Sequence, residues 1–274
     1  MASAAATWLQ SSPLSYALLP LLSRQTRLAA NVRSTHLFPS KFRLCSSRTP
    51  SKPLLMAQVK RGSSFRQDEV ASSSDLHFEA PLRIVEYPDP ILRARNKRIT
   101  TFDENLKKLV VEMFDVMYKT DGIGLSAPQV GINVQLLVFN PAGERGVGEE
   151  LVLINPKVYK YSKKMVLFNE GCLSFPGIYA DVERPETVKV DARDVNGARF
   201  TVNFSGLPAR VFQHEFDHLI GVLFFDRMTE EVLDTVRSEL QALETKFETR
   251  AGLPSPEKIE NRKRRKEVAG FGRS

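Results

Sequence analysis

Two histidines four positions apart, with a glutamate directly after the first, form the clearest chemical pattern in the sequence. His214, Glu215 and His218 lie in residues 208–220, which predict a helix that ends at Gly221. Residues four apart share one face of a helix, so both imidazoles can reach one metal ion. The glutamate then lies beside the open position of the metal, where it can exchange protons with bound water. The pattern predicts a metal-dependent hydrolase; the alternative is a helix with two partly buried histidines and no metal.

A catalytic site of this kind needs a third protein ligand, and the sequence leaves three sources to consider. One metalloprotease class continues the motif to a third histidine, but Phe224 stands at that position here. Another class supplies a glutamate farther along the chain, and Glu239 lies near the required spacing in a charge-rich helix. The last candidate is Cys172, although a lone cysteine commonly serves as a small buried apolar residue. One thiolate, two imidazoles and a water molecule would form an open site suited to Fe²⁺ or Zn²⁺.

The segments around this helix predict a fold of mixed type. An amphipathic helix is expected over residues 103–119, with Asp103 as its cap, and another over residues 230–250. Residues 187–204 predict a β-hairpin whose tight turn is the Asn-Gly pair at residue 196. Shorter strand candidates are residues 134–139, 151–154 and 165–168. Helices interspersed with hairpin strands indicate the α+β class with antiparallel or mixed sheets.

The basic charge of the chain is concentrated near its N-terminus. Ten basic residues precede the first acidic residue, Asp68, whereas the rest of the chain holds 29 basic and 32 acidic residues. The net charge of +7 therefore gives little support to nucleic-acid binding by the whole protein. The only two cysteines, Cys45 and Cys172, exclude a disulfide-built secreted scaffold. The sequence contains no run of about 18 apolar residues, so no membrane-spanning helix is expected.

Composition divides the chain into four parts. Residues 1–56 contain ten serines, seven basic residues and no acidic residue, which is typical of an organelle transit peptide. Their Ala- and Ser-rich opening favours the plastid over the mitochondrion. Residues 57–79 are expected to form a linker, residues 80–250 the catalytic domain, and residues 251–274 a basic disordered tail. The basic run in this tail is either simply solvated or a contact with RNA or the ribosome.

Three segments, taken together, resemble the signature sequences of the peptide deformylase family. They are Gly-Ile-Gly-Leu-Ser-Ala-Pro-Gln at residues 122–129, Glu-Gly-Cys-Leu-Ser at residues 170–174 and Gln-His-Glu-Phe-Asp-His at residues 213–218. Their order and separations are similar to those of the family, and the resemblance covers residues 80–230. With the N-terminal leader it indicates an organellar, plant-type member, in which the sheets of an α+β fold surround the metal-binding helix.

The resemblance implies a reaction as well as a metal site. Cys172, His214 and His218 match the family's ligands for one divalent ion, Fe²⁺ or Zn²⁺, and Glu215 matches its general acid/base. Members of the family remove the formyl group from the N-terminal methionine of new polypeptides and release formate. A metal lowers the pKa of bound water to about 7, so hydroxide is available at neutral pH to attack the formyl carbon.

Other residues of the motifs match family positions around the reacting group. The side-chain amide of Gln129 and the backbone N–H of Leu173 would stabilise the oxyanion that develops. The backbone of Gly124 would accept a hydrogen bond from the substrate amide. Glu170 and Arg184 match an ion pair that supports the cysteine segment.

Apolar residues on the same helix face as the histidines predict a pocket for the methionine side chain. Leu207 and Val211 precede the histidines at helical spacing, and the resemblance adds Ile123 and Phe168 as neighbours. Many bacterial members carry a basic residue near the substrate entrance where Tyr179 stands here, so preference beyond methionine is expected to differ. The alternative is that these apolar residues are plain core.

The function hypothesis is therefore a hydrolase that removes formyl groups from N-formylmethionyl nascent peptides in the chloroplast stroma, with the mitochondrion as a second compartment. A zinc endopeptidase of another class would need a downstream Glu or His ligand and would cleave internal peptide bonds. A non-catalytic metal-binding protein would tolerate the loss of Glu215. Partners are expected to be the nascent peptides and, through the basic tail, the ribosome; no membrane contact is expected, and the sequence does not predict an oligomeric state.

Overall fold

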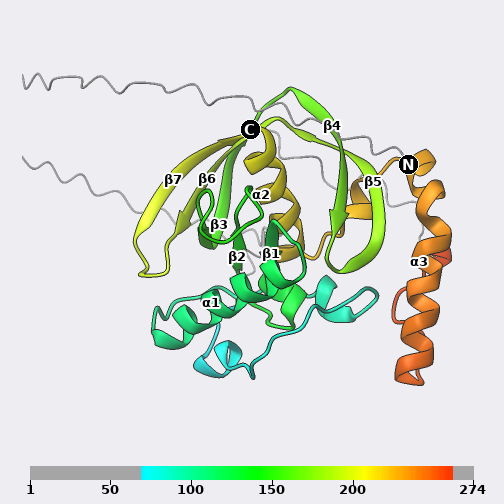
Figure 1. Cartoon of the computed structure of the whole chain (residues 1–274), viewed down its shortest axis with the longest axis horizontal. Coiled ribbons are helices and arrows are strands. Elements are labelled where there is room, and N and C mark those ends of the chain that lie inside the picture. Colours follow the sequence, from blue (N-terminus) through cyan, green and yellow to red (C-terminus); the bar gives the residue numbers. More distant parts are fainter. Residues whose placement is uncertain (1–68, 262–274) are drawn as a thin grey trace, which may run out of the picture. The chain divides into compact units, whose positions relative to one another are not determined.

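The computed structural model describes residues 69–261, which form an α+β fold (Figure 1). Five strands build the larger sheet in the order β1-β2-β3-β6-β7, and every neighbouring pair is antiparallel. These strands are β1 (Gly124–Ser126), β2 (Leu136–Phe139), β3 (Leu151–Tyr161), β6 (Thr187–Arg193) and β7 (Arg199–Ser205). A separate antiparallel pair consists of β4 (Met165–Cys172) and β5 (Phe175–Pro185). The predicted α+β class with antiparallel sheets is confirmed.

The β6–β7 hairpin forms where the sequence pattern predicts it. The carboxylate of Asp194 accepts hydrogen bonds from the backbone N–H groups of Asn196 and Ala198, both at 2.9 Å. Gly197 follows with a φ of 85°, a left-handed conformation that glycine adopts without steric cost. This turn sets the register in which Ala192 faces Phe200.

Strand β5 is absent from the sequence prediction, although the pattern that marks it is present. Ile178, Ala180 and Val182 alternate with exposed residues, and their buried side chains pack on the helix that follows the site, α3 (Glu230–Ala251). Strands β3 and β4 also run farther than predicted. Their outer halves carry Lys, Tyr and Asn residues whose side chains reach solvent, so the apolar signal ends before the backbone pairing does.

Helix α2 (Gly206–Leu219) lies between the larger sheet and the β4–β5 pair (Figure 1). It packs against β1, β2, β6 and β7 on one side and against β5 on the other. The rings of Phe212 and Phe216 stack along the helix, and Phe204 of β7 packs tilted against Phe212. Because most of α2 is buried, its polar side chains must find partners inside the protein.

Two further helices flank this centre. Helix α1 (Glu104–Lys119) shares one apolar core with β1 and β2, and its N-terminus is capped by the carboxylate of Asp103. Helix α3 packs against β5 and is capped by the hydroxyl of Thr229. Both helices lie within one residue of the ranges that their apolar spacing predicts.

The segment before the catalytic domain differs from the expected linker. Ala71 and Leu76 are buried in the same core as α1, and Val70 forms a β-bridge with Arg98. Residues 69–79 therefore belong to the folded domain, because their apolar side chains cover one side of α1. The predicted transit peptide, residues 1–56, lies outside the described residues.

The start of the C-terminal segment also differs from the expected disordered tail. Ile259 is 2% exposed, and its backbone N–H donates to Glu244 at 2.7 Å. Glu257 pairs with Arg93 at 2.6 Å. Residues 252–261 are therefore held against α3 through Ile259 and Glu244, and against Arg93 through Glu257. The predicted basic run begins at residue 262, outside the described part of the chain.

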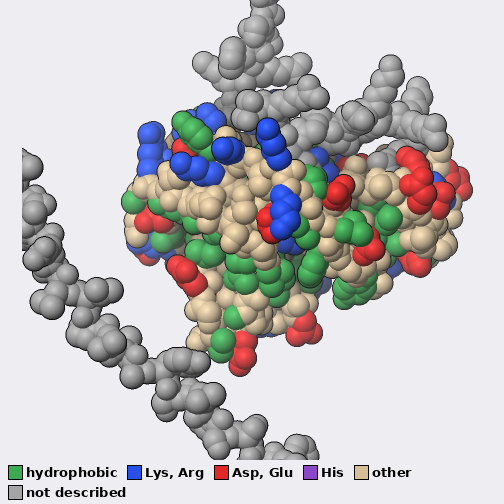
Figure 2. All heavy atoms as spheres, turned by 90° about the horizontal axis from the view of Figure 1, so that it is seen from above, with side chains coloured by type: hydrophobic (Ala, Val, Ile, Leu, Met, Phe, Trp, Pro, Cys, Tyr) green, Lys and Arg blue, Asp and Glu red, His purple; other side chains and the backbone are tan. Residues whose placement is uncertain are grey.

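Charged side chains are unevenly distributed over the surface of the domain. Figure 2 shows Lys and Arg side chains gathered over the strands, and Asp and Glu side chains gathered toward α3. Exposed basic residues of the strands and the turn between them include Lys157, Lys160, Lys163, Lys164 and Lys189. Within residues 69–261, no helix combines the length and apolar character that crossing a membrane requires.

Candidate metal centre

Three side chains that can bind a metal meet beside α2. The ligand atoms of Cys172, His214 and His218 all lie within 4.8 Å of one another. Cys172 Sγ is 3.3 Å from His218 Nε2, and both imidazoles are buried. Glu239, the alternative third ligand, is exposed on α3 and is not part of this group. The geometry thus favours the cysteine among the three sources that the sequence left open.

Two different elements bring these ligands together. Helix α2 supplies both histidines from one face, as their spacing predicts. Cys172 ends β4, where the register shifts after Gly171 and the chain turns into β5. A Cβ atom at Gly171 would lie 2.5 Å from the ring of Tyr179, so glycine allows this side chain to cover the strand. The cysteine is therefore positioned by the shape of the β4–β5 pair.

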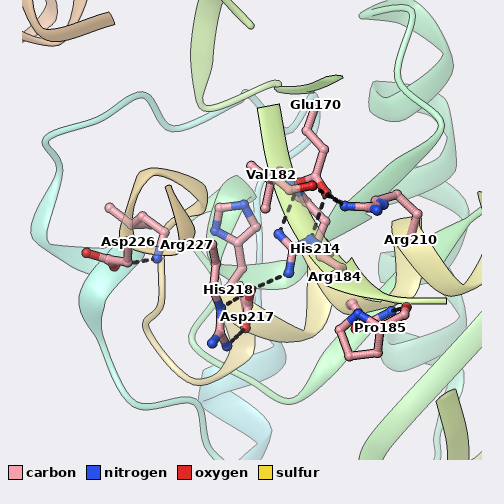
Figure 3. Close-up of polar contacts among 12 residues, drawn as sticks. Glu170, Val182, Arg184, Pro185, Arg210, His214, Asp217, His218, Asp226 and Arg227 are labelled. Atoms are coloured by element: carbon pink, nitrogen blue, oxygen red, sulfur yellow. Dashed lines mark hydrogen bonds and ion pairs between the residues drawn. The ribbon is translucent and has the colours of Figure 1, made fainter. Parts of the chain in front are cut away.

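A buried set of charges holds His214 in place (Figure 3). Glu170 Oε2 is 2.9 Å from His214 Nδ1, which leaves Nε2 of that ring for a metal. Arg184 is fully buried and donates to the two oxygens of Glu170 at 2.7 and 3.0 Å, and to Asp217 at 2.6 Å. The ion pair implied for Glu170 and Arg184 is present in the structure. Despite burial, Arg184 and His214 hold the pKa of Glu170 well below its usual range.

The electrostatics of the three ligands favour a cation. Burial opposes charge on His214, but Cys172 and Glu170 raise the pKa of that imidazole well above its ordinary value. Burial and the neighbouring His214 lower the pKa of His218 well below its ordinary value. The site therefore stabilises positive charge on one side and keeps one imidazole neutral on the other. A thiolate and two imidazoles in such a setting fit a divalent ion.

Glu215 lies in the cleft beside the ligands. It is 4% exposed, and its Oε2 is buried without a hydrogen bond to the described residues. A Cβ atom at Gly124 would lie 2.7 Å from Oε1, so the backbone of Gly124 approaches this carboxyl closely. Burial raises the pKa of Glu215 to about 7. A carboxyl with a pKa in this range can both accept and return a proton near neutral pH.

Gln129 presents a hydrogen-bond donor to the same place. It lies in the 3₁₀ helix η3 (Ala127–Val130), and its Oε1 accepts from the backbone N–H and the hydroxyl of Ser126, both at 2.8 Å. These bonds fix the amide so that Nε2 points at Cys172 Sγ, 3.5 Å away. Leu173 follows the cysteine directly and lines the cleft. The structure thus gathers both oxyanion candidates beside the ligands.

A cleft of about 650 Å³ opens next to His214 and Glu215. Its lining includes every residue that the sequence assigns to substrate binding: Ile123, Gly124, Phe168, Tyr179, Leu207 and Val211. Val211 is buried, whereas Phe168 and Tyr179 are 50% and 67% exposed. The buried side chains form the floor of the cleft and the exposed rings form its rim.

Sequence reasoning misses three charged residues of the centre. Asp217, inside the motif, accepts from Arg227 at 3.0 Å as well as from Arg184. Arg210 donates to Glu170 at 2.8 Å from one turn before His214 (Figure 3). A signal for Arg210 exists, because it stands four positions before a histidine on a helix whose neighbouring residues are apolar.

An α+β fold around a buried helix, with a Cys/His/His group and a neighbouring glutamate, defines a metal-dependent hydrolase. The chain belongs to the polypeptide deformylase family, whose model matches residues 81–233. It is 63% identical over 270 residues to peptide deformylase 1B, chloroplastic/mitochondrial, of Arabidopsis thaliana, covering 97% of each chain. It is 61% identical to peptide deformylase 1B, chloroplastic, of Solanum lycopersicum over the full length of both chains. The crystal structure of the Arabidopsis thaliana enzyme with an inhibitor matches 66% of this chain and 100% of that one, with a TM-score of 0.65 and 72% identity.

These findings confirm the predicted activity. The protein is an enzyme that removes the N-formyl group from the N-terminal methionine of newly synthesised polypeptides. The predicted plastid location is also confirmed by the names of close relatives, and the Arabidopsis relative is named for the mitochondrion as well. The endopeptidase alternative is not favoured.

Proposed function

We propose that Cys172, His214 and His218 hold one divalent ion, Fe²⁺ or Zn²⁺, and that Glu215 is the general acid/base of deformylation. The observation that carries this proposal is the convergence of the three ligand atoms within 4.8 Å, beside a buried carboxyl whose Oε2 has no hydrogen-bond partner among the described residues. A bound ion would supply Lewis-acid chemistry, lowering the pKa of water and polarising the formyl carbonyl.

The chain's own residues then handle the proton and the developing charge. Glu215 accepts a proton from the attacking water and returns it to the amine that leaves with the peptide. Gln129 Nε2 and the backbone N–H of Leu173 donate to the carbonyl oxygen of the formyl group as it becomes an oxyanion. Losing one such donor raises the free energy of the transition state by about 2.7–4 kcal/mol. The fixed amide of Gln129 therefore accounts for a substantial part of the rate enhancement.

The cleft selects the substrate by its first side chain. Ile123, Leu207 and Val211 form an apolar slot beside the ligands, which suits the unbranched side chain of methionine. The backbone of Gly124 binds the substrate amide, and Phe168 and Tyr179 flank the entrance. Because Tyr179 stands where many bacterial members carry a basic residue, this position does not attract acidic side chains at the next positions of the peptide.

The test is formate release from a formyl-Met peptide by residues 57–274, purified without oxygen, with metal analysis on the same sample. We expect one equivalent of formate per peptide and about one metal ion per chain. Cleavage of internal peptide bonds without formate would overturn the proposal in favour of an endopeptidase. Reloading the metal-free protein with Fe²⁺ or Zn²⁺ separately then decides which ion supports the faster turnover, since thiolate and imidazole ligands accept both.

Both ends of the chain are proposed to act outside catalysis. Residues 1–56 are a transit peptide, and fusing them to a reporter should direct it to plastids. The basic run in residues 262–266 is a contact for RNA of the ribosome. Deleting residues 262–274 should leave peptide turnover unchanged and weaken ribosome binding with a flatter salt dependence; equal binding by the shortened chain would reject this contact.

A further inference from the structure

Arg210 is a charged residue in the wall of a cleft that is otherwise largely apolar. It lines the same cleft as Val211 and Phe168, yet only 8% of its surface is exposed. A buried arginine beside a pocket for methionine is costly unless its donors are paired. The positions of the groups that pair with Arg210 indicate its role.

Among the described residues, the hydrogen-bond partners of the Arg210 guanidinium lie on the β4–β5 pair. Nη1 donates at 2.8 Å to Glu170 and at 2.8 Å to the backbone carbonyl of Val182, and Nη2 donates to the carbonyl of Val166. The guanidinium carbon also lies 5.5 Å from the ring centroid of Phe168, within the range of a cation–π contact. Arg210 therefore ties α2 to β4 and β5 at one point.

Two of these partners on β4 share one side of the strand. Phe168 and Glu170 are two residues apart and both precede the register shift at Cys172, so their side chains lie on the same face. Phe168 forms the cleft rim, Glu170 supports His214, and Cys172 is a proposed ligand. One guanidinium thus contacts both a residue of the cleft rim, Phe168, and the carboxylate that supports His214, Glu170.

We propose that Arg210 is a positioning residue that joins the selection of the methionine side chain to the geometry of the metal ligands. It holds the half-exposed ring of Phe168 as a wall of the pocket, and it orients Glu170 against His214. The inference rests on the proposed function of the centre and names the residue that sets its specificity. Lysine cannot replace it, because an ammonium group lacks the planar fork that bonds Glu170 and two carbonyls while facing a ring.

The experiment compares two substitutions of Arg210 with one at a matched arginine. Arg93 is likewise paired and beside an aromatic ring: it bonds the carboxylates of Asp226 and Glu257 and lies 5.2 Å from the ring centroid of Phe225, but it does not line this cleft. Arg210→Met, Arg210→Lys and Arg93→Lys are each assayed as the metal-loaded enzyme. The measurements are kcat and KM for formyl-Met and formyl-Ala peptides, together with metal retention against a chelator.

Arg210→Met should reduce the preference for formyl-Met over formyl-Ala about tenfold, mainly through KM, because the ring of Phe168 no longer stays in place. Its metal affinity should fall about 10–100-fold, the usual effect of losing support behind a ligand. Arg210→Lys should recover most of the metal affinity through its charge on Glu170 but not the preference. Arg93→Lys should keep both.

An unchanged preference in metal-loaded Arg210→Lys would overturn the proposal, as would an equal loss of preference in Arg93→Lys. Should Arg210→Met fail to fold, the lysine variant alone decides. An inactive wild-type enzyme would instead reject the proposed function, so the two failures are distinguishable.

Discussion

The metal centre is built from two halves that reach the same point by different means. The helix half is α2, which is buried on nearly every side and supplies His214 and His218 one helical turn apart. The strand half is β4, which ends in Cys172; it is mostly exposed, and within it only Glu170 is buried. The helix half is set by local geometry, since a rigid helix fixes two side chains four residues apart. The position of the strand half depends on tertiary contacts, which hold the two-stranded β4–β5 pair against helix α2.

This difference shows where the centre is vulnerable. Glu170 is the contact through which the strand half is aligned, because it binds Arg184, Arg210 and His214 at once. The helix half has its own anchor, since Asp217 binds Arg184 and Arg227. Arg184 is shared by both carboxylates, so it joins the two halves through one fully buried guanidinium.

Removing the only ligand of the strand half should have the largest effect. Cys172→Ala should lose both metal and formate release while the fold persists, because two imidazoles alone do not complete the site. Metal analysis and circular dichroism on one sample check this. Cys172→Asp should retain a metal with altered activity, since a carboxylate is also a ligand. Full metal occupancy in the alanine variant would show that Cys172 is a core thiol.

Substitution of Glu215 tests the helix half while leaving all three proposed metal ligands in place. Glu215→Gln should keep the metal and bind peptide, yet lose about 10²–10⁴-fold in kcat, because an amide cannot accept and return a proton. Steady-state kinetics with metal analysis separate the two effects. A loss of less than about tenfold would indicate a purely structural glutamate.

Glu170 and Asp217 form a matched pair that compares the two halves directly. Both are buried carboxylates on Arg184, and breaking either pair should lower the free energy of unfolding by about 3–5 kcal/mol. Only Glu170→Gln also removes the charged acceptor from His214, so metal affinity should fall about 10–100-fold in that variant and not in Asp217→Asn. Denaturant unfolding and chelator titration measure the two quantities. Equal metal affinity in both variants would show that Glu170 acts only through stability.

The same division explains what the sequence could predict. Helix α2, its two histidines and the β6–β7 hairpin follow from local periodicity and turn residues, and each lies where it is expected. Strand β5 is missed, because its alternation is broken by Pro176 and Gly177 at its start. The partners of Arg210, and Arg184 beside Asp217, come from segments distant in sequence, so no local pattern could assign them. Cys172 is identified because two histidines need a third metal ligand and because the sequence resembles a known family. Periodicity alone would not assign a role to Cys172.

Val211 lies where the helix half meets the substrate, and its substitution should have the smallest effect. It is 5% exposed and lines the cleft, and its Cγ1 would lie 2.6 Å from a Cβ atom at Gly124. Val211→Phe should therefore fill the slot and slow turnover of formyl-Met peptides more than formyl-Ala peptides.

The size of this effect follows from the volume that the ring takes from the substrate. One methylene in an apolar pocket is worth about 1–3 kcal/mol, so the ratio of kcat/KM values should change by about tens and not thousands. Val211→Ala provides the control, since it enlarges the slot and should shift the ratio less. Both variants keep His214 and His218 on the same helix face, so metal content should be unchanged. An equal loss on both substrates would mean that Val211 supports α2 against β1 and does not shape the pocket.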